Sequence, residues 1–209
     1  MTTETSDIID LLAGIETGSA LDTIRGRRVQ ARDNAQKSYL ALFEPADFAD
    51  VPSLERHAVA AFVAGIHGEP NVAGFYLAKL AGLAQGPERV AALKAEIERG
   101  RTSGPYGAFP AGPLSAEDRP GMIYRVAGDH QRVFGAKLAA ALAHAHMLVF
   151  HPRDAAPADM KALLDAGWTA TGIVTLSQLV AFLSFQVRNV AGLRALGGSL
   201  GHQLDAIAR

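Results

Sequence analysis

The stretch SLERHAVAAFVAGIHGEPNVAGFYLAKLAGL, residues 53–83, decides the fold class of this chain. Its apolar residues recur every three or four positions on both sides of a central break, a spacing that predicts amphipathic helices. They are Leu54, Val59, Phe62, Val63 and Ile66 before the break and Val72, Phe75, Leu77, Leu80 and Leu83 after it. Gly68 and Pro70 interrupt the pattern, because neither residue continues a helix well. The stretch therefore predicts two helices joined by a short turn.

Helical spacing continues through the rest of the chain, without period-two alternation of useful length. Thr169 can cap the last long helix, and Gly197-Gly198 is expected to end it. The sequence therefore predicts an all-α fold with essentially no sheet. The further predicted helices cover residues 87–100, 115–133, 135–150, 157–167 and about 170–196.

Two other segments complete the predicted organisation. Residues 2–36 are polar and rich in arginine, and we expect one helix here that runs to about Phe43. This helix is either a solvated arm, the interpretation we favour, or one that docks on the main body or a neighbouring subunit. Residues 101–114 are rich in glycine and proline and predict a long irregular loop, either a pocket cover or a plain linker. The predicted divisions are an N-terminal arm (1–44), a main domain (45–200) and a C-terminal tail (201–209).

The composition limits the functions open to the chain. Its 209 residues carry a formal net charge of −1, so no basic surface attracts nucleic acid. The absence of cysteine excludes disulfides, thiolate metal sites and thiol redox chemistry. The polar, acidic residues 1–10 do not resemble a secretion signal, and we find no apolar run of about 20 residues. We therefore expect a cytoplasmic protein that binds neither membranes nor nucleic acid.

Two stretches carry motifs whose order and spacing are informative. One begins with Ser53-Leu54-Glu55-Arg56 and reaches His67-Gly68, and the other runs from LLDAGW (163–168) to FLSFQVR (182–188). Over roughly residues 50–200 this arrangement resembles the alkylhydroperoxidase D-like (carboxymuconolactone decarboxylase) superfamily, in particular its peroxidase-related members. The resemblance implies an alkylhydroperoxidase D-like helical bundle that assembles into homodimers, trimers or hexamers.

The catalytic thiols of that superfamily have no counterpart in this chain. Under the resemblance, the two cysteines fall on Glu69 and Val72, the histidine on Tyr76 and the proton-relay glutamate on His57. Peroxide reduction needs one thiolate to attack the O–O bond and a second thiol to resolve the sulfenic acid. We therefore expect no thiol peroxidase activity.

Acid/base chemistry without a cofactor is the activity that the resemblance leaves open, since the decarboxylase branch acts on lactone acids in this way. A histidine titrates near neutral pH and suits such chemistry. Arg188 would hold a substrate carboxylate by a bidentate contact, and Trp168 is the second expected substrate-binding residue. Helix capping, solvent exposure and core packing explain the same side chains, and we favour that structural interpretation. The expected catalytic residues are His57, His67, Glu69 and Tyr76.

Three further histidines, His144, His146 and His151, suggest metal spacing at first sight. Positions i and i+2 of a helix point to different faces. His144 and His151 share a face but lie two turns, about 10 Å, apart. Zinc needs three or four converging ligands, so we expect no metal site and no cofactor.

Two functions from different classes remain after the sequence is read. The first is an enzyme-like member of the superfamily that acts on a small carbonyl or carboxylate compound. The second is a catalytically silent binding or assembly subunit, which holds a small molecule or pairs with a cysteine-bearing relative. Both are expected to form homo-oligomers, because the Ala-rich apolar helices exceed what a small monomer would bury.

Overall fold

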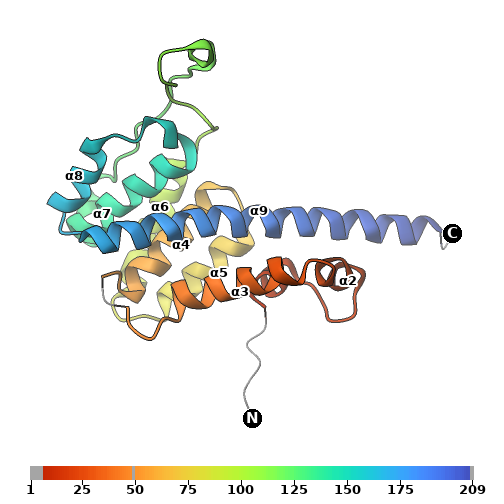
Figure 1. The fold of residues 1–209 in the computed structure, drawn as a ribbon. Coiled ribbons are helices and arrows are strands. Elements are labelled where there is room, and N and C mark those ends of the chain that lie inside the picture. Colours follow the sequence, from red (N-terminus) through yellow and green to blue (C-terminus); the bar gives the residue numbers. More distant parts are fainter. Residues whose placement is uncertain (1–6, 49, 208–209) are drawn as a thin grey trace. The chain divides into compact units, whose positions relative to one another are not determined.

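The computed structural model describes residues 7–48 and 50–207, with side chains to residue 200, and this part of the chain is all-α (Figure 1). It contains no strand, only an isolated bridge between Gly107 and Arg119, so the predicted all-α class is confirmed. The helices are α1 (Ile8–Ala13), α2 (Ala20–Gly26), α3 (Val29–Phe43), α4 (Ser53–Ile66), α5 (Pro70–Ala81), α6 (Gly86–Gly100), α7 (Gly128–Phe150), α8 (Pro157–Asp165) and α9 (Ala170–Ile207), with 3-10 turns η1 (Pro113–Glu117) and η2 (Pro152–Asp154).

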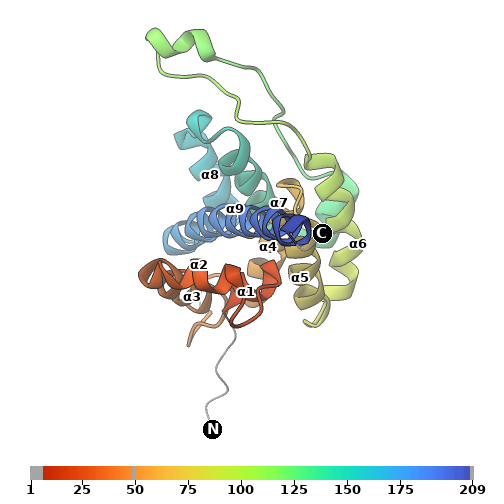
Figure 2. The ribbon, with the colours of Figure 1, turned by 90° about the vertical axis from the view of Figure 1, so that its right-hand side faces the viewer.

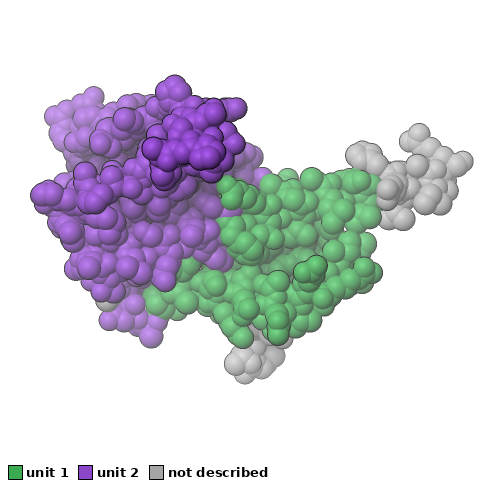
Figure 3. Space-filling view, turned by 45° about the horizontal axis from the view of Figure 1, so that its top comes forward, with its two compact units in different colours: residues 1–45, 185–209 green, residues 46–184 purple. Residues whose placement is uncertain are grey.

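The chain divides into two compact units, which Figure 3 colours separately. Unit 1 combines residues 1–45 with residues 185–209, and unit 2 comprises residues 46–184. Helix α9 begins in unit 2 and continues into unit 1.

Helix α4 forms the centre of unit 2, because every residue from Arg56 to Ile66 is buried. It packs against α5, α6 and α7. The contact with α6 depends on Gly65, since a Cβ at this position would lie 2.6 Å from Cγ2 of Ile97. The predicted turn between α4 and α5 is confirmed, with Gly68 at φ 77° and Pro70 in the first turn of α5. This hairpin positions His57 and Tyr76.

The segment between α6 and α7 is longer and less helical than expected. The prediction of a helix over 115–133 is wrong for residues 115–127, where only the η1 turn forms, and holds for residues 128–133, which belong to α7. Pro120 and Gly121 interrupt any helix in between, as both residues disfavour helical continuation. Figures 1 and 2 show η1 at the far end of this connection, away from the helices of unit 2. Within α7 itself, Gly135 breaks the helix at φ 74°, ψ 165°.

Helix α9 does not end at Gly197-Gly198, so that prediction is wrong. Glycine costs about 1 kcal/mol relative to alanine inside a helix, which flanking helix formers can outweigh. Gly197 also lies against α2 within unit 1, where a Cβ would come 2.9 Å from Cδ1 of Leu21. A larger residue at 197 would therefore require the Leu21 side chain to shift.

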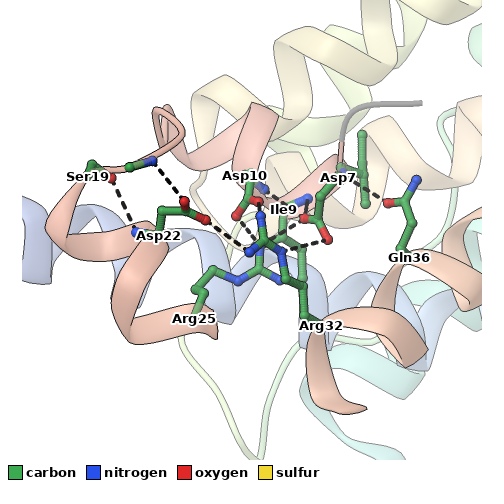
Figure 4. A network of polar contacts seen from close by, with 10 residues as sticks. Asp7, Ile9, Asp10, Ser19, Asp22, Arg25, Arg32 and Gln36 are labelled. Carbon is green, nitrogen blue, oxygen red and sulfur yellow. Dashed lines mark hydrogen bonds and ion pairs between the residues drawn. The ribbon is translucent and has the colours of Figure 1, made fainter. Parts of the chain in front are cut away.

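The N-terminal segment forms three helices where one was expected, and residues 2–6 of that prediction lie outside the described residues. Its arginines are not simply solvated, because Arg25 and Arg32 pair with Asp7, Asp10 and Asp22 (Figure 4). The side chain of Arg25 is only 9% exposed. This ion-pair network joins α1, α2 and α3 within unit 1.

Two described helices have the length and composition of a membrane span, namely α7 and the Ala170–Leu200 part of α9. Half of each is buried inside the structure, as is usual for core helices of globular proteins. These helices qualify although the sequence suggested that none would, and the cytoplasmic location stays a prediction.

Candidate functional site

A pocket of about 580 Å³ lies in unit 2 between α7, α8 and the segment that precedes α7. One wall is a face of α7 that carries alanines at positions i, i+3, i+4 and i+7, whose small side chains leave the space open. The polar residues on the lining come from the segment before α7, from α7, from the η2 region and from α8. The alanines are Ala136, Ala139, Ala140 and Ala143.

His144 is one of two buried histidines on the lining of this pocket, with only 8% of its surface exposed, and His151 is the other. Its Nε2 lies 3.1 Å from Oγ of Ser177, and that hydroxyl lies 2.9 Å from the carbonyl oxygen of Ile173. Because a serine hydroxyl has one hydrogen, and Ile173 receives it, we assign the proton between His144 and Ser177 to Nε2. Nδ1 of His144 then carries a lone pair, and this atom is buried without a hydrogen-bond partner.

The protonation state of His144 follows from its surroundings. Burial lowers its pKa below the ordinary value for histidine, and the carboxylate of Asp159 opposes this with a smaller upward effect. The imidazole is therefore neutral at neutral pH. A neutral imidazole whose Nδ1 has no partner can accept a hydrogen bond or a proton.

His151 and Asp154 form a second polar pair on the same pocket. Nδ1 of His151 lies 3.1 Å from Oδ2 of Asp154, whose other oxygen accepts a 2.7 Å hydrogen bond from the amide of Ala108. The ring of Tyr106 stacks on His151 at 4.9 Å between centroids. Gly107, at φ 107°, brings the backbone so close that a Cβ would lie 2.5 Å from the Asp154 carboxylate. The 101–127 connection thus holds this histidine–aspartate pair in place.

Behind the pocket wall lies Glu96, which is 0% exposed. It accepts 2.5 Å hydrogen bonds from the Tyr124 hydroxyl and from Nδ1 of His130, a 3.1 Å bond from the amide of Ala127 and a 2.7 Å ion pair from Arg99. Burial alone would raise the pKa of Glu96, but these donors and the Arg99 charge outweigh it and the pKa lies below its usual value. Glu96 is therefore ionised and anchors Tyr124, a lining residue.

His146, in contrast, is a structural residue. It is 0% exposed, its Nε2 donates to the Gly100 carbonyl oxygen at 2.9 Å, and its ring stacks on Tyr124 at 4.8 Å. Burial lowers the pKa of His146 to about 4. Among the residues that the structure describes, no group of three histidine, aspartate or glutamate side chains is arranged to hold a metal ion.

The structure brings two of the sequence-predicted catalytic residues together. The rings of His57, on α4, and Tyr76, on α5, lie 6.5 Å apart between centroids. Nδ1 of His57 lies 2.7 Å from the Ser53 carbonyl oxygen, one turn back on the same helix. Burial is the main cause that lowers the pKa of His57, and hence the ring is neutral at neutral pH.

The other two predicted catalytic residues lie at the opposite end of the α4–α5 hairpin. His67 is ten residues beyond His57, which corresponds to about 15 Å along the helix axis, and its Nε2 lies 3.2 Å from Oγ of Ser184. Glu69 is the residue before α5 and makes no side-chain capping bond. His57 and Tyr76 therefore lie near each other, whereas His67 and Glu69 lie at the turn between α4 and α5.

The two predicted substrate-binding residues belong to different units. Trp168 is 3% exposed, donates from Nε1 to the Lys137 carbonyl oxygen at 2.9 Å, and lies under the Lys137 ammonium at 4.6 Å. These contacts join the turn between α8 and α9 to α7. Arg188 is exposed on the part of α9 that belongs to unit 1.

The sequence did not predict this pocket, although it did indicate that two of its histidines share a helix face. The helical spacing already placed His144 and His151 on one face of α7, where they were considered only as metal ligands. Ala136, Ala140 and Met147 lie on that face too, and a small-residue face with histidines on it was a usable indication of a pocket. The contributions of Asp154 and Asp159 come from elements that no local pattern connects to α7.

Comparisons with protein families, curated proteins and solved structures found no match. The resemblance to the alkylhydroperoxidase D-like superfamily therefore stays a prediction.

Proposed function

We propose that the protein binds a small, mostly apolar molecule in the α7–α8 pocket, and that this molecule donates a hydrogen bond to Nδ1 of His144. The observation that carries the proposal is the buried lone pair of that atom. A buried polar group without a partner costs about 1–3 kcal/mol, which a donor on a ligand would offset. This is the binding function considered from the sequence, placed at different residues.

The shape and chemistry of the pocket support the proposal. Its volume of about 580 Å³ is typical of small-molecule sites. Such sites combine apolar walls with a few polar groups that orient the ligand. Here the alanine face of α7 supplies the apolar wall, while His144 supplies the orienting group.

A second candidate function is acid/base catalysis without a cofactor in the same pocket. It is favoured by the contact between His151 and Asp154, because a carboxylate that accepts from Nδ1 orients the ring and leaves Nε2 as the basic nitrogen. This retains the chemistry predicted from the sequence but assigns it to His151. The sequence-derived set of His57, His67, Glu69 and Tyr76 stays a separate prediction for the same chemistry.

The test distinguishes the effect of Nδ1 of His144 on binding from the effect of the contact between its Nε2 and Ser177. His144→Gln places an amide near the position of Nε2, so it keeps a partner for Ser177 but lacks Nδ1. Ser177→Ala is the matched control, because it removes the contact and keeps Nδ1. Fragment-sized compounds are screened by NMR on alanine-methyl-labelled protein, with resonances of Ala136, Ala139, Ala140 and Ala143 as reporters.

We expect donor-bearing fragments to shift the pocket methyl resonances of the wild-type protein. Binding should fall about tenfold in His144→Gln, which corresponds to one lost hydrogen bond of about 1.4 kcal/mol, and persist in Ser177→Ala. Fragments that bind His144→Gln and wild type equally, or a screen without pocket shifts, would contradict the proposal.

A further inference from the structure

The polar groups that line the pocket favour one chemical class of ligand. Nδ1 of His144 is an acceptor without a partner. The carboxylates on the lining come from Asp154, which is exposed, and Asp159, which is partly exposed. Two lining donors are already used within the protein, because Nε2 of Gln131 donates to the Val126 carbonyl oxygen at 3.0 Å and the Tyr124 hydroxyl donates to Glu96. The pocket therefore offers acceptors and negative charge.

From this arrangement we infer that the ligand is a primary or secondary amine with an apolar body, bound as its ammonium ion between Nδ1 of His144 and the carboxylate of Asp159. The inference rests on the proposed function and names the ligand class for the same pocket. An ammonium group has several N–H donors, so it can bond to both residues at once.

Asp159 is well placed for this role. It lies at the third position of α8, where its Oδ2 accepts a 2.9 Å hydrogen bond from the amide of Ala156, and it is only partly exposed. Asp159 and His144 line the same pocket, and the charge of Asp159 acts electrostatically on His144. A hydrogen bond between an ammonium group and a carboxylate is about twice as strong as one between neutral groups.

Other ligand classes satisfy the pocket less well. An alcohol can donate to His144 but brings no charge to Asp159. A carboxylate would meet the lone pair of His144 and the negative charge of Asp159, both of which repel it. Arg125 is the lining cation, but its side chain is exposed and one of its nitrogens, Nη1, donates to the Tyr124 carbonyl oxygen at 3.2 Å.

The experiment uses three probes that share one hydrocarbon ring: cyclohexylamine, cyclohexanol and cyclohexanecarboxylate. Each is titrated into the full-length protein at pH 7.5, and the pocket alanine methyl resonances are followed. We expect the amine to bind about tenfold more tightly than the alcohol, and the carboxylate to bind most weakly.

Two variants of α8 test whether amine binding requires the negative charge of Asp159. Asp159→Asn keeps an oxygen for the Ala156 amide and removes the negative charge, so it should lower amine affinity to that of the alcohol and leave the alcohol unchanged. Asp165→Asn makes the same charge change at the exposed end of α8, where Asp165 pairs with Lys161. This control should leave all three affinities unchanged.

The outcomes distinguish this inference from the proposed function. If the carboxylate binds as tightly as the amine, or if Asp159→Asn leaves the amine affinity unchanged, the amine assignment is wrong while the pocket remains a binding site. If none of the three probes shifts the pocket resonances, while the spectrum shows folded protein, the proposed function fails and the inference falls with it.

Discussion

The buried carboxylate of Glu96 accepts a 2.5 Å hydrogen bond from the hydroxyl of Tyr124, and this contact joins α6 to the wall of the pocket. Burial and the acceptor together raise the pKa of Tyr124 above its ordinary value, so the phenol stays protonated and keeps donating. The same carboxylate holds the amide of Ala127 at the start of α7. One residue on α6 thus organises the end of the 101–127 connection.

Replacing Glu96 by alanine should destabilise the protein by about 3–5 kcal/mol, because the variant buries Tyr124 and His130 without their partner. Urea unfolding followed by circular dichroism measures this change. Glu98→Ala is the matched control on the same helix, since Glu98 is exposed and pairs with the exposed Arg101 at 3.3 Å. A difference between the two variants of less than about 1 kcal/mol would show that the buried network contributes little.

Acid should destabilise the protein through His146, whose pKa burial lowers to about 4. Between about pH 6.5 and 4 the unfolded chain binds this proton and the folded chain does not, so stability falls as the pH falls through that window. The shift corresponds to about 3 kcal/mol. Burial also lowers the pKa values of His144 and His57, so both residues make the protein less stable in acid in the same way. For His146, electrostatic repulsion from the neighbouring His151 is a smaller cause of the lowered pKa.

Urea midpoints at pH 7 and pH 4.5 should therefore differ less in His146→Phe than in the wild-type protein. Phenylalanine keeps the stacking on Tyr124 but has no proton to gain. An unchanged pH dependence in this variant would place the acid sensitivity elsewhere.

Gly107→Ala should disturb the His151–Asp154 pair. The new Cβ would lie 2.5 Å from the Asp154 carboxylate, and the φ of 107° disfavours any side chain, so we expect a loss of about 1–3 kcal/mol. The side-chain nitrogen resonances of His151 should report a changed tautomer balance. Gly112→Ala, in the same connection, meets nothing closer than 3.8 Å and serves as the control. Equal effects of both variants would mean that the close approach of Gly107 to Asp154 does not hold the His151–Asp154 pair in place.

Gly65→Ala should separate α4 from α6, because its Cβ would overlap the side chain of Ile97. Overpacking of this kind costs about 1–3 kcal/mol. Gly74→Ala on α5 has open space around it and should instead stabilise the helix by about 0.5–1 kcal/mol. Thermal unfolding of both variants checks the pair, and Ile97→Ala in the Gly65→Ala background should restore part of the loss. A stable Gly65→Ala variant would mean that Ile97 moves aside without cost.

The chain should also form a homo-oligomer, as its apolar helices suggested. Large apolar side chains remain exposed on α9, among them Val174 at 57% and Phe185 at 44%. Light scattering at micromolar concentration should give a multiple of the 22.0 kDa chain mass. A mass of one chain would refute this prediction.

Local patterns were reliable where one segment decides its own structure. The spacing from Leu54 to Ile66 determined α4, and Pro70 marked the start of α5, because both depend on residues within a few positions. The same reasoning failed at Ser115 and at Gly197. At Ser115 a plausible helix start is followed by Pro120, and at Gly197 the helix continues where Leu21 of α2 comes close to it.

By itself, the sequence determined an all-α chain without thiol chemistry, because helix periodicity and the absence of cysteine are properties of the residues alone. The chemistry of the candidate site was decided only by tertiary structure. His144 and Ser177 are 33 positions apart, and Glu96 and Tyr124 are 28 apart. Which nitrogen of His144 carries the proton, and whether Glu96 stays charged when buried, depend on partners that only the folded chain brings within hydrogen-bonding distance.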